Sequence, residues 1–442
     1  MKPLFLYFAM SNSYLYQLFC LKCPKIITDS RKACQGSIFF ALKGESFDGN
    51  EFAAQALASG CEYAVVNRSE LATDERYILV DDVLKALQDL AREHRKHLNI
   101  PVIAITGTNG KTTTKELIKS VLATKYEVCA TSGNLNNHIG APLTILEISP
   151  TTQIAIIEMG ANHVGEIKFL CEIARPTCGL ITNIGKAHLE GFGGFDGVKR
   201  AKKELYDFLN EHKGLIFYNE ENHILTDMLK NVETNKICYS SVSQSDSRSK
   251  IRAAAPFLQA DLIIGDKTFC LSTQLAGVYN FENILAAVCV GKYFNVSSEK
   301  IRTAIEAYLP QNNRSQVVRT KRNQLLLDYY NANPTSMYNS LNNFFAHIKE
   351  EKMLILGDMF ELGDEATNEH TTIIDLLLSQ QNLISMVVGK HFYEAAKAHP
   401  QIIAFRDVEE LKKQLADNPP KDKFILIKGS RGMKLEQIRE FL

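Results

Sequence analysis

The stretch ITGTNGKTTTKELI (residues 105–118) places glycines, a lysine and a run of threonines between an apolar segment and a segment with helical spacing. The apolar segment, VIAIT (residues 102–106), is typical of a buried strand. Glycines at such a junction let backbone N–H groups approach an anion closely. Lys111 would add a positive charge, and Thr112 would add a hydroxyl group for a metal ion. The pattern predicts a phosphate-binding loop of the short form G-x-x-G-K-T; an ordinary glycine turn is the alternative.

The composition is that of a soluble globular protein with several domains. At about 150 residues per domain, 442 residues suggest about three domains. Lys and Arg total 50, as do Asp and Glu, so the formal charge is zero and nucleic acid is not an expected partner. No segment reaches the roughly 20 apolar residues that span a bilayer, so we expect no membrane insertion. We expect a cytoplasmic protein that acts as a monomer.

The ten cysteines are scattered, which favours small core side chains in a reducing compartment. Cys20 and Cys23 form one C-x-x-C pair, but no second pair follows at zinc-ribbon spacing. The first ten residues, MKPLFLYFAM, mimic the start of a signal peptide but lack a cleavage site of the A-x-A type. We interpret them as a coincidence, or as an upstream start ahead of Met10.

Breaks in the pattern divide the chain into three predicted domains: residues 1–98, 99–313 and 314–442. The first has short strands and helices, and predicts a small α/β domain. The second alternates apolar strands with helices, which predicts a mostly parallel sheet of P-loop ATPase type with helices on both faces. The third repeats the alternation and predicts a doubly wound, Rossmann-like domain. Within the second, we expect a surface loop over residues 240–250 and a hairpin over residues 260–273.

Polar residues follow several of these strands, where ligands of open α/β sheets bind. Glu158 ends one strand, and His188 lies in a glycine-rich loop after the next. Taken singly, each has an ordinary structural interpretation, as a capping residue or a hydrogen-bonded histidine. Together with Thr112 they could converge on magnesium. Asn331 and Asn333 precede a predicted helix, and their amides suit recognition of a nucleotide or a peptide.

At this point eight motifs resemble those of the Mur ligases. They are GTNGKTTTKEL, GNLNNHIGAPLTIL, EMGANHVGEI, TNIGKAHLEGFG, AKKEL, GVYNFEN, YNANPTSM and GDMFELG. The resemblance runs from residues 28–50 to residues 428–436, nearly the whole chain. The motifs EMGANHVGEI and YNANP resemble those of the family member that joins D-alanyl-D-alanine to UDP-N-acetylmuramoyl-tripeptide. The short phosphate loop is shared with the wider family, including folylpolyglutamate synthases.

The resemblance implies ATP, two magnesium ions and a lysine carbamylated by carbon dioxide, with Lys111, Lys202 and His188 as catalytic residues. The residues that it implies for ATP are Gly107, Thr108, Asn109, Gly110, Lys111, Thr112, Thr113, Asn280, Asn283, Arg314 and Asp328. Those that it implies for magnesium are Thr112, Glu158, His188 and Lys202. Those that it implies for the UDP-linked tripeptide and the dipeptide are Ser30, Arg31, Lys43, Asp48, Asn136, Asn137, Asn162, His163, Tyr330, Asn331 and Asn333.

The resemblance also implies a reaction and a division of labour. ATP would phosphorylate the tripeptide carboxylate, the dipeptide amine would attack the acyl phosphate, and ADP and phosphate would leave. The first domain would bind the UDP end of the substrate, the second ATP, and the third would close on the acceptor. Diaminopimelate and lysine remain alternatives for the third peptide residue. The chain departs from the family pattern at Leu327-Asp328, where relatives often carry paired aspartates, and at Asn50, where histidine is common.

The carbamylated lysine would be Lys202, in a helix that also carries Lys199, Arg200 and Lys203. A solvated basic face is the alternative interpretation of that helix. We expect the three neighbouring cations to lower the pKa of Lys202, because like charges disfavour the protonated form. A neutral amine is the form that reacts with carbon dioxide.

Three other functions compete with this interpretation. A different Mur ligase or a folylpolyglutamate synthase would use the same phosphate loop, but the latter begins near its loop and lacks a preceding domain. A GTPase-type switch needs an N-K-x-D guanine signature, which is absent from the sequence. A non-catalytic UDP-sugar-binding module would not need Lys111, Thr112 and Glu158 together.

Overall fold

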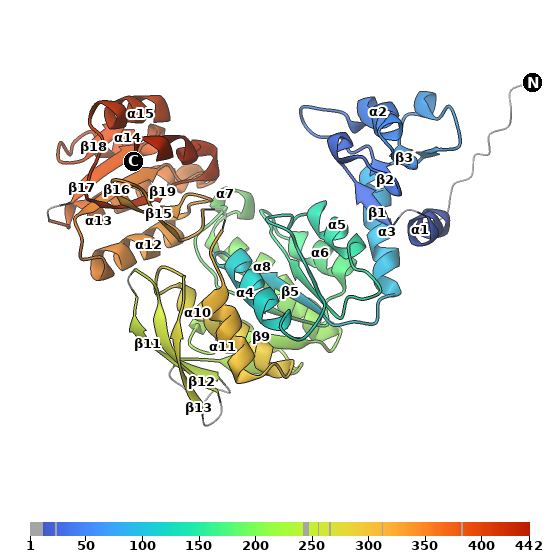
Figure 1. Ribbon diagram of the computed structural model, residues 1–442, viewed down its shortest axis with the longest axis horizontal. Coiled ribbons are helices and arrows are strands. Elements are labelled where there is room, and N and C mark those ends of the chain that lie inside the picture. Colours follow the sequence, from blue (N-terminus) through green and yellow to red (C-terminus); the bar gives the residue numbers. More distant parts are fainter. Residues whose placement is uncertain are drawn as a thin grey trace, which may run out of the picture.

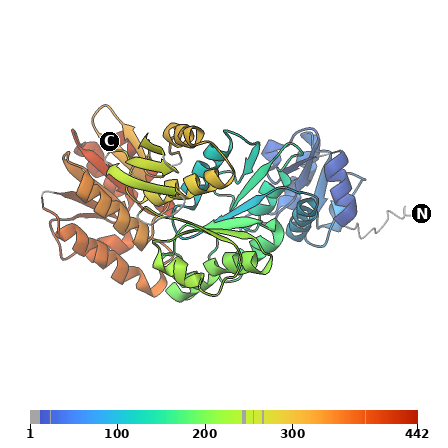
Figure 2. The ribbon, with the colours of Figure 1, turned by 90° about the horizontal axis from the view of Figure 1, so that it is seen from below.

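The computed structural model describes residues 12–22, 24–241, 247–254, 256–264, 267–311, 313–381 and 383–442. Four sheets follow one another in this part of the chain, with four, six, three and six strands. Figure 1 shows the N-terminal sheet and the C-terminal sheet on opposite sides of the central one, and Figure 2 shows the same arrangement from below. This is the three-domain α/β architecture that the sequence predicts.

The N-terminal domain is built on a parallel sheet in the order β1-β2-β3-β4. Its strands are β1 (Lys25–Ile27), β2 (Ser37–Phe40), β3 (Tyr63–Val66) and β4 (Tyr77–Leu79). Its helical segments are α1 (Asn12–Leu21), η1 (Ser30–Lys32), η2 (Gly49–Phe52), α2 (Ala53–Ala58), η3 (Ser69–Leu71) and α3 (Val83–Lys96). The chain then leads through Pro101 into the central sheet.

The helix α3 fastens the N-terminal domain to the central one. Its apolar side chains share one continuous core with α5 (Gly140–Leu146) and α6 (Glu166–Ala174). The Arg95 guanidinium donates from Nε to the carbonyl oxygen of Ala174 at 2.7 Å and from Nη2 to that of Arg175 at 2.9 Å. These carbonyl groups end α6, where the helix has no further N–H partners to offer. The contact between the two domains is therefore both apolar and hydrogen-bonded.

The central domain has a six-stranded parallel sheet in the order β10-β9-β8-β5-β7-β6. Its strands are β5 (Val102–Thr106), β6 (Val128–Ala130), β7 (Ile154–Glu158), β8 (Cys178–Ile181), β9 (Leu215–Asn219) and β10 (Lys236–Tyr239). Besides α5 and α6, its helices are α4 (Lys111–Leu122), α7 (Leu189–Phe192), α8 (Phe195–Glu211), α9 (His223–Met228), α10 (Asn280–Tyr293) and α11 (Ser298–Ala307).

Both faces of this sheet are covered, as the continuous apolar strands predict. In β5, Val102 and Ala104 belong to the core with α5, α6 and α8, whereas Ile103 and Ile105 belong to a second core with α4 and α10. Successive side chains of a strand point to opposite faces, so a strand between two helical layers must be apolar at every position. The phosphate loop thus begins on one of the most buried strands of the molecule.

An antiparallel sheet of three strands follows the central one. It consists of β11 (Ser247–Ala253), β12 (Gln259–Ile264) and β13 (Lys267–Ser272). The hairpin predicted over residues 260–273 is confirmed. The loop predicted over residues 240–250 is wrong at its end, where residues 247–250 pair with β12; its residues 242–246 lie outside the described part. An edge strand requires only backbone pairing, so polar composition does not exclude one.

The C-terminal domain has a six-stranded sheet in the order β14-β15-β19-β16-β17-β18, parallel except for the pair β14 and β15. Its strands are β14 (Gln316–Arg319), β15 (Gln324–Asp328), β16 (Lys352–Gly357), β17 (Ile384–Val388), β18 (Ile403–Phe405) and β19 (Phe424–Lys428). Its helical segments are α12 (Pro334–His347), η4 (Gly363–Glu365), α13 (Ala366–Leu378), α14 (Lys390–Ala396), α15 (Val408–Asp417), η5 (Arg431–Met433) and η6 (Leu435–Phe441). Separate apolar cores cover its two faces.

Two further expectations concern the chain as a whole. Within the described ranges, no helix combines the length and the apolar character that a bilayer crossing requires. The cysteines of those ranges are all free, and Cys20 is exposed. Cys23, the other half of the C-x-x-C pair, and the leader-like first ten residues lie outside the described part.

Candidate active site

The loop between β5 and α4 needs both of its glycines. Gly107 has a φ of 140° and Gly110 a φ of 79°, a backbone region that favours glycine. A Cβ atom on Gly107 would lie 2.1 Å from Oγ1 of Thr182, and one on Gly110 would lie 2.6 Å from Oδ1 of Asn283. Neighbouring side chains therefore occupy the space that any larger residue would need.

The strand end next to β5 holds this loop in place. The backbone N–H of Thr108 donates to the carbonyl oxygen of Asn183 at 2.9 Å, and that of Asn109 donates to Oδ1 of Asn183 at 3.0 Å. The hydroxyl group of Thr182 donates to the carbonyl oxygen of Asn109 at 2.6 Å. The two residues that follow β8 thus fix the shape of the loop.

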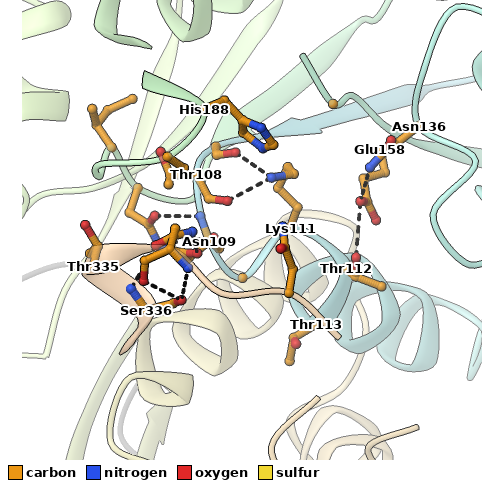
Figure 3. A pocket seen from close by; sticks show the side chains of 18 of the residues that line it. Thr108, Asn109, Lys111, Thr112, Thr113, Asn136, Glu158, His188, Thr335 and Ser336 are labelled. Atoms are coloured by element: carbon orange, nitrogen blue, oxygen red, sulfur yellow. Dashed lines mark hydrogen bonds between the residues drawn. The ribbon is translucent and has the colours of Figure 1, made fainter. Parts of the chain in front are cut away.

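Lys111 opens α4 and folds back over its own loop (Figure 3). Its ammonium group donates to the carbonyl oxygens of Gly107 at 2.7 Å and Thr108 at 2.9 Å. Burial lowers the pKa of Lys111 to about 8, a value that also includes the opposing charge of Glu158 and a smaller lowering by Arg314. The amine is still mainly protonated at neutral pH, so it can supply charge to a phosphate.

Glu158 and Thr112 meet beside this lysine (Figure 3). The hydroxyl group of Thr112 donates to Oε1 of Glu158 at 3.1 Å, and Nδ2 of Asn136 donates to the same atom at 2.8 Å. The other oxygen, Oε2, is buried, and the described residues offer it no hydrogen bond. Its nearest cation is the ammonium group of Lys115, 3.8 Å away. A buried carboxylate oxygen without a hydrogen bond is costly unless a cation lies close to it.

These donors fit magnesium, which prefers hard oxygen ligands. No group of three or more His, Cys, Asp or Glu side chains within the described residues could hold a metal ion by itself. A magnesium ion at Thr112 and Glu158 would therefore take its other ligands from phosphate oxygens and water, which is usual for this ion.

His188 stands at the start of α7 and faces the C-terminal domain. Its Nδ1 atom contacts the carboxylate of Glu361, and its ring lies edge-on to Phe192 at 6.4 Å between centroids. The contact with His188 holds the pKa of Glu361 below its ordinary value, although partial burial opposes it. His188 therefore receives one contact from each of two domains.

Lys202 is buried in α8, with 3% of its surface exposed. Its ammonium group lies 3.5 Å from the carbonyl oxygen of Ala161 and 5.2 Å from the ring centroid of Phe192. Burial, and then the charge of Lys111, lower the pKa of Lys202 to about 7, against the opposing charges of Glu166 and Glu204.

The predicted direction of this pKa shift is confirmed, but the predicted cause is wrong. Lys199 pairs with Asp196 at 3.0 Å, Lys203 pairs with Asp207, and Arg200 is exposed. These residues lie on the outer face of α8, where water and carboxylates screen their charges. The charges that act on the amine of Lys202 are instead those of Lys111, Glu166 and Glu204.

Two asparagines of α10 connect that helix to the phosphate loop. The hydroxyl group of Thr114 donates to Oδ1 of Asn283 at 2.9 Å, and Nδ2 of Asn283 donates to Oδ1 of Asn280 at 2.8 Å. Nδ2 of Asn280 in turn donates to the carbonyl oxygen of Ala276 at 2.8 Å. The chain of amides fixes α10 against α4 at the edge of the cavity.

The C-terminal domain contributes a charged wall. Lys428 donates from Nζ to Oδ2 of Asp328 at 2.6 Å, so Asp328 is paired. The guanidinium group of Arg314 lies 3.6 Å from the ring centroid of Tyr330, and that of Arg431 lies 5.3 Å from the same point. The aromatic ring thereby holds two cations at the edge of the site.

The predicted site residues fall into two groups. Most line a single cavity of about 700 Å³: Gly107, Thr108, Asn109, Gly110, Lys111, Thr112, Thr113, Asn136, Asn137, Glu158, Asn162, His188, Lys202, Asn280, Asn283, Arg314, Asp328, Tyr330, Asn331 and Asn333. Five lie outside it: Ser30, Arg31, Lys43, Asp48 and His163. His163 pairs with Glu166 and its side chain is 65% exposed. The other four belong to the N-terminal domain.

Three segments of the chain match domains of one family. Residues 25–95 match the Mur ligase family, catalytic domain; residues 105–291 match the Mur ligase middle domain; and residues 313–431 match the Mur ligase, glutamate ligase domain. The chain belongs to the Mur ligase family.

Among Mur ligases, the chain is similar to UDP-N-acetylmuramoyl-tripeptide--D-alanyl-D-alanine ligases. It is 34% identical to that of Bacillus subtilis, covering 93% of this chain and 92% of the relative. It is 32% identical to that of Escherichia coli, with the same coverage. The crystal structure of MurF from Acinetobacter baumannii has a TM-score of 0.84 at 32% identity, covering 94% of this chain and 92% of that one. MurF from Thermotoga maritima in complex with ADP has a TM-score of 0.82 at 27% identity, covering 94% and 96%.

Sequence reasoning missed three polar residues of this Mur ligase site. Lys115 is fully buried, donates to the carbonyl oxygen of Thr131 at 2.5 Å, and is the cation nearest to Glu158. Its spacing of four from Lys111 was a usable signal, because both must lie on one face of α4. The position of Asn183 at a strand end was a comparable signal, whereas Glu361 gave none, since its contact joins segments far apart in the chain.

Proposed function

We propose that this protein is an ATP-dependent amide ligase that joins D-alanyl-D-alanine to UDP-N-acetylmuramoyl-tripeptide, releasing ADP and phosphate. The observation that carries the proposal is the cavity itself. A phosphate loop with Lys111, a buried carboxylate at Glu158 and a wall of the C-terminal domain line one space. Relatives that cover nearly the whole chain are named for this reaction. The protein would thereby act in peptidoglycan precursor synthesis.

We assign one task to each domain. Residues 1–98 would bind the UDP end of the substrate, through Ser30, Arg31, Lys43 and Asp48. Residues 99–313 would bind ATP, and residues 314–442 would present the dipeptide amine, with Tyr330, Asn331 and Asn333 near it. Asn136, Asn137, Asn162 and His163 would contact the peptide. The position of His163 outside the cavity suits only a peripheral contact.

The phosphoryl transfer follows from the loop. Backbone N–H groups of residues 107–112 and the ammonium group of Lys111 would hold the β- and γ-phosphates at the start of α4. Asn280, Asn283, Arg314 and Asp328 would border the rest of the nucleotide. One oxygen of the tripeptide carboxylate attacks the γ-phosphorus, and the bond to the β-phosphate oxygen breaks. The products of this step are ADP and an acyl phosphate.

The amide bond forms in a second step. The neutral amine of D-alanyl-D-alanine attacks the acyl carbon, the carbon–oxygen bond to phosphate breaks, and a proton leaves the nitrogen. The acyl phosphate must be kept from water, which would hydrolyse it. The contacts between the central and C-terminal domains, at Asn109 and Asn333 among others, support a role of domain docking in that exclusion.

Thr112 and Glu158 would hold one magnesium ion, and His188 and a carbamate of Lys202 would hold a second. Magnesium, when bound, neutralises charge on the transferring phosphoryl group. The burial of Lys202 and its pKa of about 7 support carbamylation, because a substantial fraction of the amine is neutral at physiological pH. The carbamate would be an anion in a pocket that also contains Lys111.

We further propose that the protein works in the cytoplasm, where ATP is available, and supports cell shape and division through the cell wall. The test is phosphate release with ATP, magnesium and UDP-linked tripeptide, with and without D-alanyl-D-alanine. We expect release that depends on the dipeptide, together with a product whose mass equals the two substrates less water. Turnover of folate and glutamate, with none of the UDP-tripeptide, would reverse the assignment.

A further inference from the structure

The contact between His188 and Glu361 joins two domains at the cavity. His188 belongs to the loop after β8, and Glu361 lies two residues before η4 of the C-terminal domain. Nδ1 of His188 is buried and lies against the Glu361 carboxylate as an ion-pair contact, and the described residues offer this atom no regular hydrogen bond besides. His188 and Lys111 line the same cavity, and Figure 3 labels both.

Both residues have left-handed backbone conformations. The φ angle is 50° at His188 and 62° at Glu361. This region is unfavourable for residues that have a Cβ atom, and such conformations persist only where the surrounding structure enforces them. Next to Glu361, a Cβ atom on Gly363 would lie 3.3 Å from Cβ of Glu190, so the two loops are tightly packed. Two enforced conformations that meet at a cavity suggest a functional contact.

The segment that carries Glu361 is held firmly within its own domain. The backbone N–H of Met359 donates to Nε2 of buried His370 at 3.0 Å, and that of Phe360 donates to Oγ of Ser430 at 2.9 Å. Glu361 is therefore presented by a fixed support and does not extend from a loose loop. Its carboxylate therefore contacts His188 whenever the C-terminal domain is docked on the central domain.

Docking itself does not depend on Glu361. The ammonium group of Lys186 pairs with Glu369 at 2.6 Å, and the backbone N–H of Lys186 donates to Oγ1 of Thr335 at 2.9 Å. These two contacts hold the same loop of the central domain against α12 and α13. The Glu361 contact can thus be removed without separating the domains, which leaves the imidazole orientation as its main effect.

We propose that Glu361 is a positioning residue, which orients His188 for phosphoryl transfer only when the C-terminal domain is docked. A carboxylate at Nδ1 keeps the proton on that nitrogen and leaves the lone pair of Nε2 for the cavity. The C-terminal domain, which is proposed to present the dipeptide amine, then also completes the phosphate site through Glu361. Carboxylate activation is thereby linked to readiness of the acceptor. This inference rests on the proposed ligase function.

The first test compares Glu361→Ala, Glu361→Gln and Asp364→Asn. Asp364 is exposed in the same segment and provides a control for loss of a negative charge. We expect kcat to fall about 10- to 100-fold in Glu361→Ala, as for other residues that orient an imidazole, with little change in KM for the dipeptide. Glu361→Gln should retain more activity, because its amide oxygen can still accept the Nδ1 proton. A higher KM for the dipeptide at unchanged kcat would overturn the proposal.

The second test is a double-mutant cycle with His188→Ala. If Glu361 acts through His188, adding Glu361→Ala to His188→Ala should change kcat less than twofold. An equal loss in both backgrounds would show a role independent of His188 and overturn the inference. Thermal melting of each variant separates these outcomes from misfolding.

A third readout does not need turnover. In ¹⁵N spectra of the imidazole, assigned with the His188→Ala variant, the proton of His188 should reside on Nδ1 in the wild type. The Glu361→Ala variant should lose that preference. An unchanged tautomer would contradict the inference even if the enzyme is a ligase, whereas absence of dipeptide-dependent phosphate release in the wild type would contradict only the proposed function.

Discussion

Asn333 of the C-terminal domain donates a hydrogen bond from Nδ2 to Oδ1 of Asn109 in the phosphate loop, at 2.8 Å. The same side chain caps α12, because its Oδ1 atom accepts from the backbone N–H of Ser336 at 2.9 Å. One amide thus begins a helix in one domain and supports an anion-binding loop in another. Binding of ATP should therefore respond to a residue that belongs to the acceptor domain.

The Asn333→Ala variant should lose both contacts. We expect a decrease of about 1 kcal/mol in the free energy of unfolding from the lost cap, together with weaker ATP binding. Ser297→Ala is the matched control, because Ser297 caps α11 by accepting from the backbone N–H of Lys300. Denaturant unfolding and calorimetric titration with ATP measure the two effects. Equal ATP affinity in both variants would contradict the coupling.

Lys111→Ala should abolish turnover and leave the fold intact. The ammonium group lies over the proposed phosphate loop, and its loss removes two hydrogen bonds to the loop carbonyls. Lys119→Ala, at an exposed position of the same helix, should retain activity. Phosphate release and thermal melting provide the measurements. Near-normal phosphate release by Lys111→Ala would show that the loop does not act in phosphoryl transfer as proposed.

The sequence could predict the parts of this site that depend on local chain geometry. A strand, a glycine-rich turn and a helix follow one another at residues 102–122, so the local pattern was enough to predict the phosphate loop and Lys111. Glu158 was predicted because adjacent parallel strands end at the same edge of a sheet. A helix start just after Asn333 was also predicted and is confirmed, although the capping role of Asn333 was not predicted.

The rest depended on three-dimensional packing. Glu361 approaches His188 only because two domains dock, and no local pattern encodes that contact. The pKa of Lys202 is set by burial and by Lys111, which lies on another helix, so its sequence neighbours gave the right direction for the wrong reason. The strand at residues 247–253 is polar, and only its pairing with β12 reveals it.

Lys202→Ala should be nearly inactive, and short carboxylic acids should partly restore its activity. The acid would occupy the space of the proposed carbamate and replace its negative charge. Lys203→Ala, on the outer face of the same helix, should behave like the wild type. In addition, ¹³C-labelled carbon dioxide should give a carbamate signal in the wild type and none in Lys202→Ala. Normal activity of the alanine variant would leave Lys202 without a catalytic role.

The low pKa of Lys202 also predicts how stability changes with pH. The folded protein releases this proton near pH 7, whereas an unfolded lysine retains it up to its ordinary pKa of 10.5. The unfolded state therefore binds more protons between these values, and the stability of the wild type should rise with pH across that window. Lys202→Met removes the buried charge, so it should stabilise the protein most at pH 7 or below, by a few kcal/mol.

Denaturant unfolding of the ligand-free protein in buffer free of carbon dioxide measures this effect. The gain from Lys202→Met should shrink steadily between pH 7 and pH 10, while Lys203→Met should show no such trend. A gain that stays constant over this range would mean that the amine of Lys202 remains charged in the folded protein.

Gly110→Ala should weaken ATP binding more than the unfavourable backbone conformation of the alanine alone would. The added Cβ atom would lie 2.6 Å from Oδ1 of Asn283, so α10 would have to move away from the loop. Gly36→Ala is the control, because Gly36 has a φ of 72° but open space around a Cβ atom. Gly36→Ala should cost about 1 kcal/mol of stability and leave ATP affinity unchanged. Equal effects of the two changes would show that backbone conformation alone matters at Gly110.

Because Arg95 anchors α3 on the end of α6, the N-terminal domain is held at a fixed distance from the central domain. If the UDP end of a substrate is fixed on the N-terminal sheet, the distance from there to the phosphate loop is constant. Each residue of an extended peptide spans about 3.5 Å, so a peptide shorter by one residue would leave its carboxylate that far from the phosphoryl group. Such an enzyme would select its substrate by counting residues, without having to contact every side chain of the peptide.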